Sequence, residues 1–117
     1  MKQNILKTKS FDFALRIVKL VRYLKKEHKE FDLSRQILRS GTAIGALVRE
    51  SEHAESKKDF IHKLNIALKE ANETEYWIEL LATAEFITIQ MATALANDIK
   101  ELLRILIAII KTSKLRT

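Results

Sequence analysis

The stretch RSGTAIGALVRES, residues 39–51, holds both glycines of the 117-residue chain. Gly41 and Gly45 lie four residues apart within an apolar pattern typical of a helix, where glycine is unfavourable by about 1 kcal/mol relative to alanine. Four residues advance a helix by only about 40° round its axis, so both glycines lie on the apolar stripe. We predict that they let a neighbouring helix backbone approach closely. The alternative is a local bend in a long helix.

The rest of the composition favours helices as well. The chain has no proline, and Ala, Leu, Ile, Lys and Glu dominate it, most of which are strong helix formers. The absence of cysteine excludes disulfides, thiolate nucleophiles and cysteine-ligated metals. The length favours a single domain over residues 1–117. We see no secretory signal and no apolar run long enough to span a membrane, so we expect a soluble, cytoplasmic protein.

Apolar residues recur at helical spacing in four consecutive segments, at about residues 10–28, 33–54, 56–83 and 88–112. Ser10 and Asp32 are expected to cap the first two segments, and Ser56 with Asp59 resembles a capping box. The connections between segments are short, which favours antiparallel neighbours. We therefore predict an all-α fold, an antiparallel up-down-up-down four-helix bundle.

Charge is distributed unevenly along the chain, whose formal net charge is +6. Residues 1–30 carry nine Lys and Arg against three Asp and Glu, residues 31–99 carry seven against eleven, and residues 100–117 carry five against one. Both ends are therefore basic and the middle is acidic. This asymmetry indicates a polyanionic partner more strongly than the total charge does.

Basic residues form a stripe on each of the first and last helical segments. The first and last helices of an up-down bundle are neighbours, so we expect the two stripes to form one patch that binds the phosphates of RNA or DNA. Tyr23 could stack on an exposed base. The alternative is two ordinary solvated faces. The candidate nucleic-acid-binding residues are Arg16, Lys19, Arg22, Tyr23, Lys26, Lys100, Arg104 and Lys111.

The third and fourth segments carry more apolar residues than one core requires. A helix that is apolar on two faces is buried on two faces, and a chain of this size has no second layer to cover them, so we expect self-association. The alternative is scattered surface apolar residues, which are common. The candidate interface residues are Ile66, Trp77, Leu80, Ile105 and Ile107.

Few residues suggest catalysis. Glu50 and His53 form one E-x-x-H pair, whereas two-metal bundles need two such pairs and further carboxylates. Glu75 lies on the core stripe of its segment and needs a partner, for which Arg39 and Arg49 are candidates. We expect no enzyme activity, metal or cofactor.

Three segments of the chain carry a family resemblance: FDFALRIVKLVRYL, LSRQILRSGTAIGALVRESEHAESKKDFIHKLNIALKEANETEYWIELLATAEFI and ELLRILIAIIKT. Residues 39–81 are the most specific part. In these segments the chain resembles the 23S ribosomal-RNA intervening-sequence protein family. Many relatives have Ala or Ser where this chain has Gly41, and Asn-Ile in place of Leu47 and Val48.

The resemblance implies an antiparallel four-helix bundle that forms a homopentamer and has no known catalytic activity. Some relatives are encoded within insertions in ribosomal RNA genes. A similar group, the accessory variability proteins of diversity-generating retroelements, comprises basic pentamers that associate with nucleic acid and reverse transcriptase.

Together these observations predict a non-enzymatic, oligomeric helical protein that binds RNA or DNA through a basic surface. One alternative is a protein-interaction adaptor, for example for a reverse transcriptase, whose charge only aids solubility. A less favoured alternative is a metal-dependent enzyme that uses Glu50 and His53.

Overall fold

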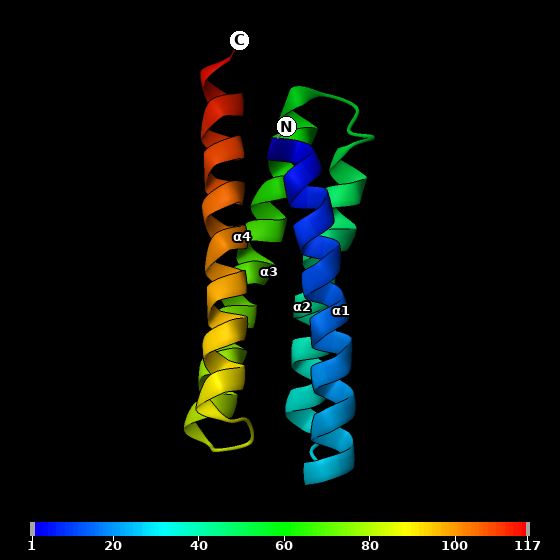
Figure 1. Cartoon of the computed structure of the whole chain (residues 1–117). Helices are drawn as coiled ribbons and strands as arrows, with labels where there is room; N and C mark the ends of the chain where they lie inside the picture. The colour runs from blue at the N-terminus through cyan, green and yellow to red at the C-terminus, as the bar shows by residue number, and fades with distance from the viewer. Residues whose placement is uncertain (1, 117) are drawn as a thin grey trace.

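The computed structural model describes residues 2–116 and contains four antiparallel helices, which run alternately up and down (Figure 1). They are α1 (Lys2–His28), α2 (Asp32–Ser51), α3 (Lys57–Thr83) and α4 (Ile89–Leu115). The bundle measures about 50 × 21 × 19 Å, and both ends of the chain lie at the same end of it. The predicted all-α up-down-up-down four-helix bundle is confirmed.

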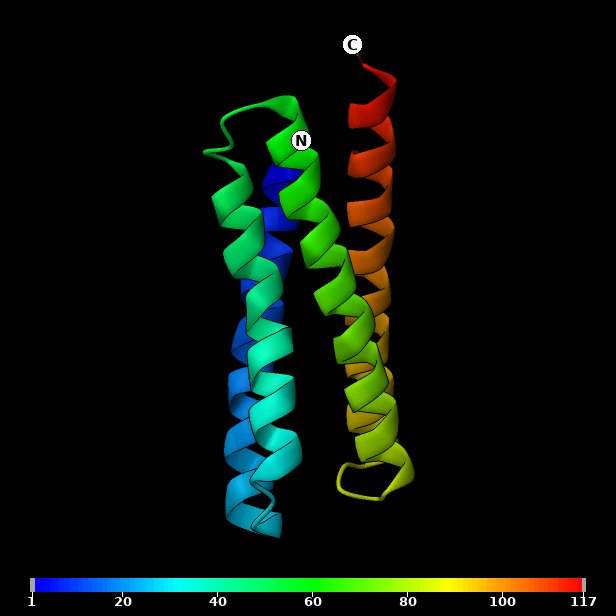
Figure 2. The same ribbon diagram turned by 180° about the vertical axis from the view of Figure 1, so that it is seen from behind.

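The bundle consists of two helix pairs, α1 with α2 and α3 with α4, that face each other (Figure 2). Each helix contacts two neighbours and no helix contacts its diagonal partner. Of the four seams, the one between α1 and α4 is the sparsest. The first and last helices are therefore neighbours, as expected, but they pack less closely than the other pairs.

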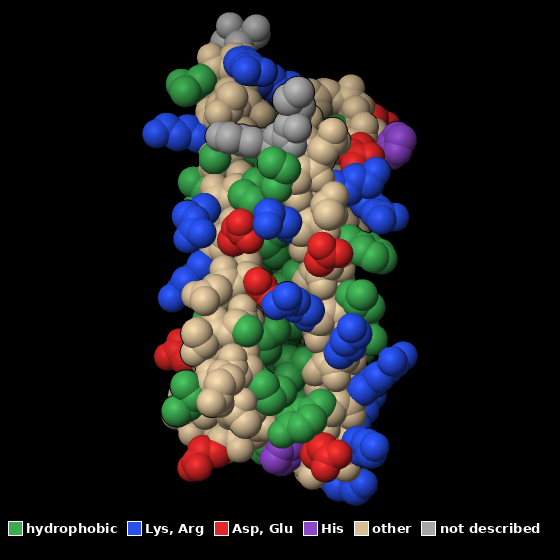
Figure 3. Space-filling view, viewed as in Figure 1, with side chains coloured by type: hydrophobic (Ala, Val, Ile, Leu, Met, Phe, Trp, Pro, Cys, Tyr) green, Lys and Arg blue, Asp and Glu red, His purple; other side chains and the backbone are tan. Residues whose placement is uncertain are grey.

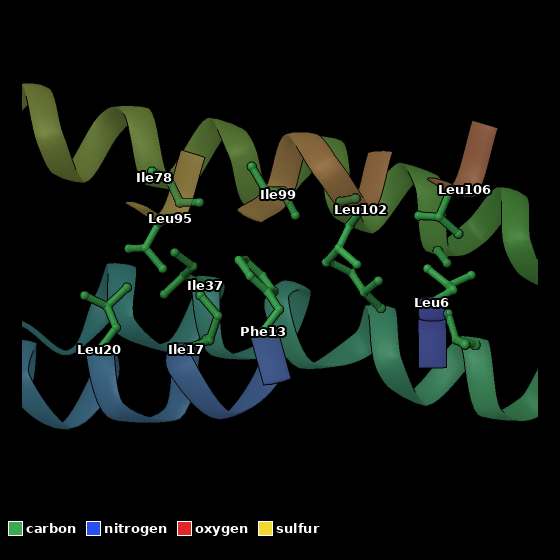
Figure 4. Packing of buried hydrophobic residues seen from close by; sticks show 14 of the residues in the cluster. Leu6, Phe13, Ile17, Leu20, Ile37, Ile78, Leu95, Ile99, Leu102 and Leu106 are labelled. Carbon is green, nitrogen blue, oxygen red and sulfur yellow. The ribbon is translucent and has the colours of Figure 1, made fainter. Parts of the chain in front are cut away.

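The core fills the space between the two pairs (Figure 4). Phe13 and Ile17 of α1 and Ile37 of α2 meet apolar side chains from the facing pair, and all three are at most 2% exposed. The facing side chains include Leu95, Ile99, Leu102 and Leu106, which recur on α4 at helical spacing. Burial of this apolar stripe is the main stabilising term of the fold.

Close packing of α1 on the glycines of α2 is confirmed. A Cβ atom added at Gly41 would lie 2.8 Å from Cγ1 and 3.1 Å from Cγ2 of Ile17. One added at Gly45 would lie 3.3 Å from the backbone oxygen of Ser10. All three distances are shorter than ordinary van der Waals contacts of a Cβ atom, so the missing side chains are what allow α1 to lie this close.

Ser10 does not cap α1. Instead the helix begins eight residues earlier, because Leu6 continues the buried stripe at 1% exposure. Ser10 is itself buried, and its hydroxyl donates to the carbonyl of Lys7. The expected cap at this position is therefore wrong, and α1 gains two further turns of core contact.

The predicted Ser56 cap of α3 is confirmed, but the second bond of the capping box goes to Glu55, the residue before the cap. The Ser56 hydroxyl accepts a hydrogen bond from the backbone N–H of Asp59 at 3.0 Å, and the Asp59 carboxylate accepts one from the N–H of Glu55 at 3.1 Å. The first bond satisfies a backbone donor that the start of a helix leaves free, and the second holds the residue before the cap. Thr88 caps α4 in the same way, by accepting from Met91.

The start of α2 is held by Glu30 and not by the predicted cap Asp32, which is the first residue of the helix. The Glu30 carboxylate accepts from the N–H groups of Leu33 at 3.1 Å and Ser34 at 2.8 Å. Partial burial alone raises the pKa of this carboxyl, but the hydrogen bonds outweigh it, so the pKa lies below its ordinary value. The charged form therefore stabilises the start of α2.

The glycine contact predicts that Gly41→Ala destabilises the protein by about 1–3 kcal/mol, since the new methyl group overpacks against Ile17. Urea denaturation measures the loss. In an Ile17→Ala background the same substitution should cost much less, because Cγ1 and Cγ2 of Ile17 are gone. An equal loss of stability in both backgrounds would show that contact with Ile17 does not determine the effect of a side chain at Gly41.

The Glu30 cap predicts a pH-dependent effect. Glu30→Gln should lower the free energy of unfolding at pH 7 by a few tenths to about 1 kcal/mol. The stability from the charged carboxyl is present above the unfolded pKa of about 4.3 and is lost as pH falls through the lower folded pKa. Denaturation at pH 7 and pH 3 should therefore show a deficit only at pH 7. Glu27→Gln is the control, and the same deficit at both pH values would contradict the cap.

Candidate nucleic-acid interface

The basic stripe of α1 faces outward from the bundle. Lys19, Arg22 and Lys26 are all exposed, and none of them forms an ion pair with any side chain in residues 2–116. Their spacing of three and four residues places them on neighbouring turns of one flank. These three cations are therefore free to bind an external anion.

Arg16 has a different role from the rest of its stripe. Its Nη1 lies 2.5 Å from Oδ2 of Asp98, and Lys9 Nζ lies 3.2 Å from Oε1 of Glu101. Both ion pairs join α1 to α4 across the sparse seam. Because Arg16 already has a carboxylate partner, it is a weaker candidate for phosphate binding than Lys19.

The basic stripe of α4 lies on a different flank from that of α1. Lys100, Arg104 and Lys111 are exposed and form no ion pair within the described chain. Figure 3 shows Lys and Arg side chains along the outer flanks of α1 and α4, with acidic, basic and apolar side chains between the two flanks. The single patch expected from the adjacency of the helices does not form.

The physical reason is the helical period of α4. Asp98 and Glu101 lie on the flank of α4 that faces α1, where they form ion pairs with Arg16 and Lys9 of α1. At about 100° per residue, Arg104 lies on the side of α4 opposite the buried stripe. The two basic surfaces are hereafter the α1 flank (Lys19, Arg22 and Lys26) and the α4 flank (Lys100, Arg104 and Lys111).

Tyr23 is half-buried beside the α1 flank. Its hydroxyl lies 3.3 Å from Nε2 of His28, and the two rings meet edge to face at 5.4 Å. His28 in turn meets Phe86, from the turn between α3 and α4, at 5.5 Å. This aromatic cluster closes the seam between α1 and α4 at the end of the bundle away from the termini.

A groove of about 320 Å³ opens along the same seam. Sequence reasoning did not find it, because its walls come from two helices and its floor from two core leucines. The spacing of Arg16, Lys19 and Tyr23 places them on one side of α1, but nothing in the sequence indicates which residues of α4 face them. The groove is lined by Arg16, Lys19, Leu20, Tyr23, Met91, Ala94 and Leu95.

The predicted second apolar face is only partly exposed. Ile66 and Leu80 are half-buried, and Trp77 and Ile105 pack against the core. Ile107 is 53% exposed. The structure adds three exposed apolar residues of α1 that sequence reasoning missed, Ile5 at 45% exposure and the pair Phe11 and Leu15 at 53% and 47%. The spacing of four residues within the pair is the signal that could have found it.

Arg39 forms the main polar cluster between α2 and α3. Its guanidinium binds the carboxylates of Glu70, at 3.2 Å, and Glu73. Trp77 Nε1 donates to Glu73 at 2.9 Å. The cluster therefore ties the two helices together with charge-assisted bonds.

The expected partners of Glu75 are not found. Arg39 binds the two other glutamates, and the guanidinium of Arg49 lies 5.3 Å above the ring of Phe11. Two residues along a helix turn a side chain by about 200°, so Glu75 faces away from the side on which Glu73 meets α2.

Two further observations concern metals and membranes. The Glu50 carboxylate accepts from Lys63 Nζ at 3.1 Å, and residues 2–116 contain no group of three or more His, Asp or Glu that could hold a metal ion. None of the helices in this part of the chain is long and apolar enough to cross a membrane.

The fold and its surface define a small antiparallel four-helix-bundle protein with two basic flanks. Residues 2–108 match the family model described as 23S rRNA-intervening sequence protein, so the chain belongs to that family. No curated protein matches the chain.

A solved structure supports the same assignment. The chain is similar to a protein of unknown function from the S23 ribosomal protein family of Bacteroides thetaiotaomicron, known from its crystal structure. The two share 58% identity and superpose with a TM-score of 0.94, over 95% of this chain and 99% of the other.

Proposed function

We propose that this protein is a non-enzymatic, self-assembling binder of RNA or DNA, and that the α1 flank makes its principal phosphate contacts. The observation that carries the proposal is the set of exposed cations at Lys19, Arg22 and Lys26, which have no carboxylate partner in the described chain. Cations of this kind gain affinity for nucleic acid by releasing the counterions of its phosphates.

The α4 flank supplies a second, separate contact. Its three cations are equally free of partners, but they lie on another side of the bundle. A nucleic-acid strand bound to a single copy of the protein therefore contacts only one of the two flanks at a time. Assembly multiplies the number of flanks and hence the total attraction for a long polyanion.

Self-assembly is the second part of the proposal. Phe11 and Leu15 expose apolar surface on α1, and Ile107 does so on α4. Burial of such residues between copies removes apolar surface from water. The family resemblance implies five copies, so we propose a homopentamer.

The adaptor hypothesis differs in its dependence on charge. A surface that binds a protein such as a reverse transcriptase through apolar contacts should bind nucleic acid only weakly, and the α1 flank should then have no special role. Charge reversal on that flank separates the two functions.

Lys19→Glu combined with Lys26→Glu should weaken binding of a fluorescently labelled RNA oligonucleotide by at least roughly tenfold, since two phosphate contacts become repulsive. Fluorescence anisotropy at constant salt measures the change. Lys58→Glu combined with Lys69→Glu makes the same change in net charge on exposed positions of α3 and should cost much less. An equal loss of RNA affinity in both double variants would show that binding depends only on net charge.

The wild-type protein should have a solution mass of about five times the 13.5 kDa of one chain. Light scattering coupled to size exclusion measures this mass. Phe11→Glu combined with Leu15→Glu should reduce it, because the interface would then bury two charges. Thr93→Glu with Asn97→Glu is a matched control on α4 that should leave it unchanged. A monomeric wild-type protein would refute self-assembly.

A further inference from the structure

The groove between α1 and α4 combines two kinds of surface. Its floor is formed by Leu20 and Leu95, which belong to the core, and Met91 and Ala94 form its α4 wall. On the α1 side it is bordered by Arg16, Lys19 and Tyr23. An occupant must therefore offer an apolar body to the floor and negative charge to the rim.

The groove is also short. The ion pair of Arg16 with Asp98 crosses the seam at one end, and the aromatic cluster of Tyr23, His28 and Phe86 closes the other. The stretch from Arg16 to Tyr23 covers seven steps of a helix, or about 10 Å. A long partner helix laid along the seam would have to cross the ion pair or the cluster, whereas a compact flat group would not.

Lys19 and Lys26 are spaced so that they can bind negative charges on either side of a flat group placed against Tyr23. Lys19 lies four residues before Tyr23 and Lys26 lies three residues after it, so each is about one turn away on the same side of α1. Both are exposed and form no ion pair within residues 2–116. Phosphates attached to either side of a group in the groove would meet these two lysines.

We propose that this groove receives an unpaired nucleobase, with Tyr23 and Met91 against the base and Lys19 and Lys26 on the flanking phosphates. This inference rests on the proposed nucleic-acid binding and narrows it to single strands. A base in a duplex is stacked and paired and cannot enter a groove whose floor is the bundle core, whereas an unpaired base can.

The test fills the groove without changing charge. Ala94 is exposed on its wall, so Ala94→Trp should leave the fold intact and occupy the space of the base. Ala46→Trp, at an exposed position of α2, is the matched control. Binding of one labelled RNA oligonucleotide is measured by anisotropy, both as a single strand and as a duplex with its complement. Circular dichroism verifies the helical content of each variant.

The proposal predicts that wild-type protein prefers the single strand and that Ala94→Trp weakens single-strand binding by about tenfold, the range expected for loss of one stacked base. Duplex binding should change less than about twofold, and Ala46→Trp should change neither.

Four results would overturn the proposal. If the wild-type protein binds both forms equally, or if Ala94→Trp weakens both equally, the groove does not take a base, although phosphate binding stands. If Ala94→Trp instead changes the solution mass of the free protein, the groove is a contact between copies. If the wild-type protein binds neither form, the proposed function fails together with the groove.

Discussion

The structure depends on the close contact between α1 and the glycine face of α2. Ile17 lies against Gly41, and the backbone at Ser10 lies against Gly45, so α1 is held at two points two helical turns apart. Rotation of α1 about its axis would disrupt both contacts. The direction of every α1 side chain follows from that constraint: Arg16 faces α4, while Lys19 and Arg22 face solvent.

The seam between α1 and α4 is built differently from the other three. It has the fewest contacts, and two ion pairs cross it, in which every member is at least 32% exposed. Exposed ion pairs stabilise by only about 0–1 kcal/mol each. Because few contacts join α1 to α4, a groove remains beside Tyr23. The carboxylates of Asp98 and Glu101, which form the two ion pairs, lie between the α1 flank and the α4 flank and separate them.

The sequence is sufficient to predict the helices and their order, because apolar periodicity, short connections and the Ser56 cap all depend on neighbours along the chain. The early start of α1 is harder to predict, because Ser10 resembles a cap although Leu6 continues the apolar stripe before it. The Glu30 cap was missed because its carboxylate reaches across the turn to Leu33 and Ser34.

Predictions about surfaces succeeded less well than those about helices, for a geometric reason. Helical spacing is sufficient to predict the basic stripe on each helix, but the relative position of the two stripes depends on which flank of α4 faces α1. Asp98 and Glu101 determine that relation, and their partners lie more than eighty residues away along the chain. The exposed apolar residues Phe11 and Leu15 could have been recognised from their spacing alone.

Photo-crosslinking tests most directly whether nucleic acid lies along α1 beside the groove. A single-stranded RNA containing 4-thiouridine is irradiated with the wild-type protein, and the crosslinked peptides are mapped by mass spectrometry. We expect crosslinks concentrated within residues 16–26 and 91–95. Crosslinks confined to α2 and α3, or none at low salt, would contradict it.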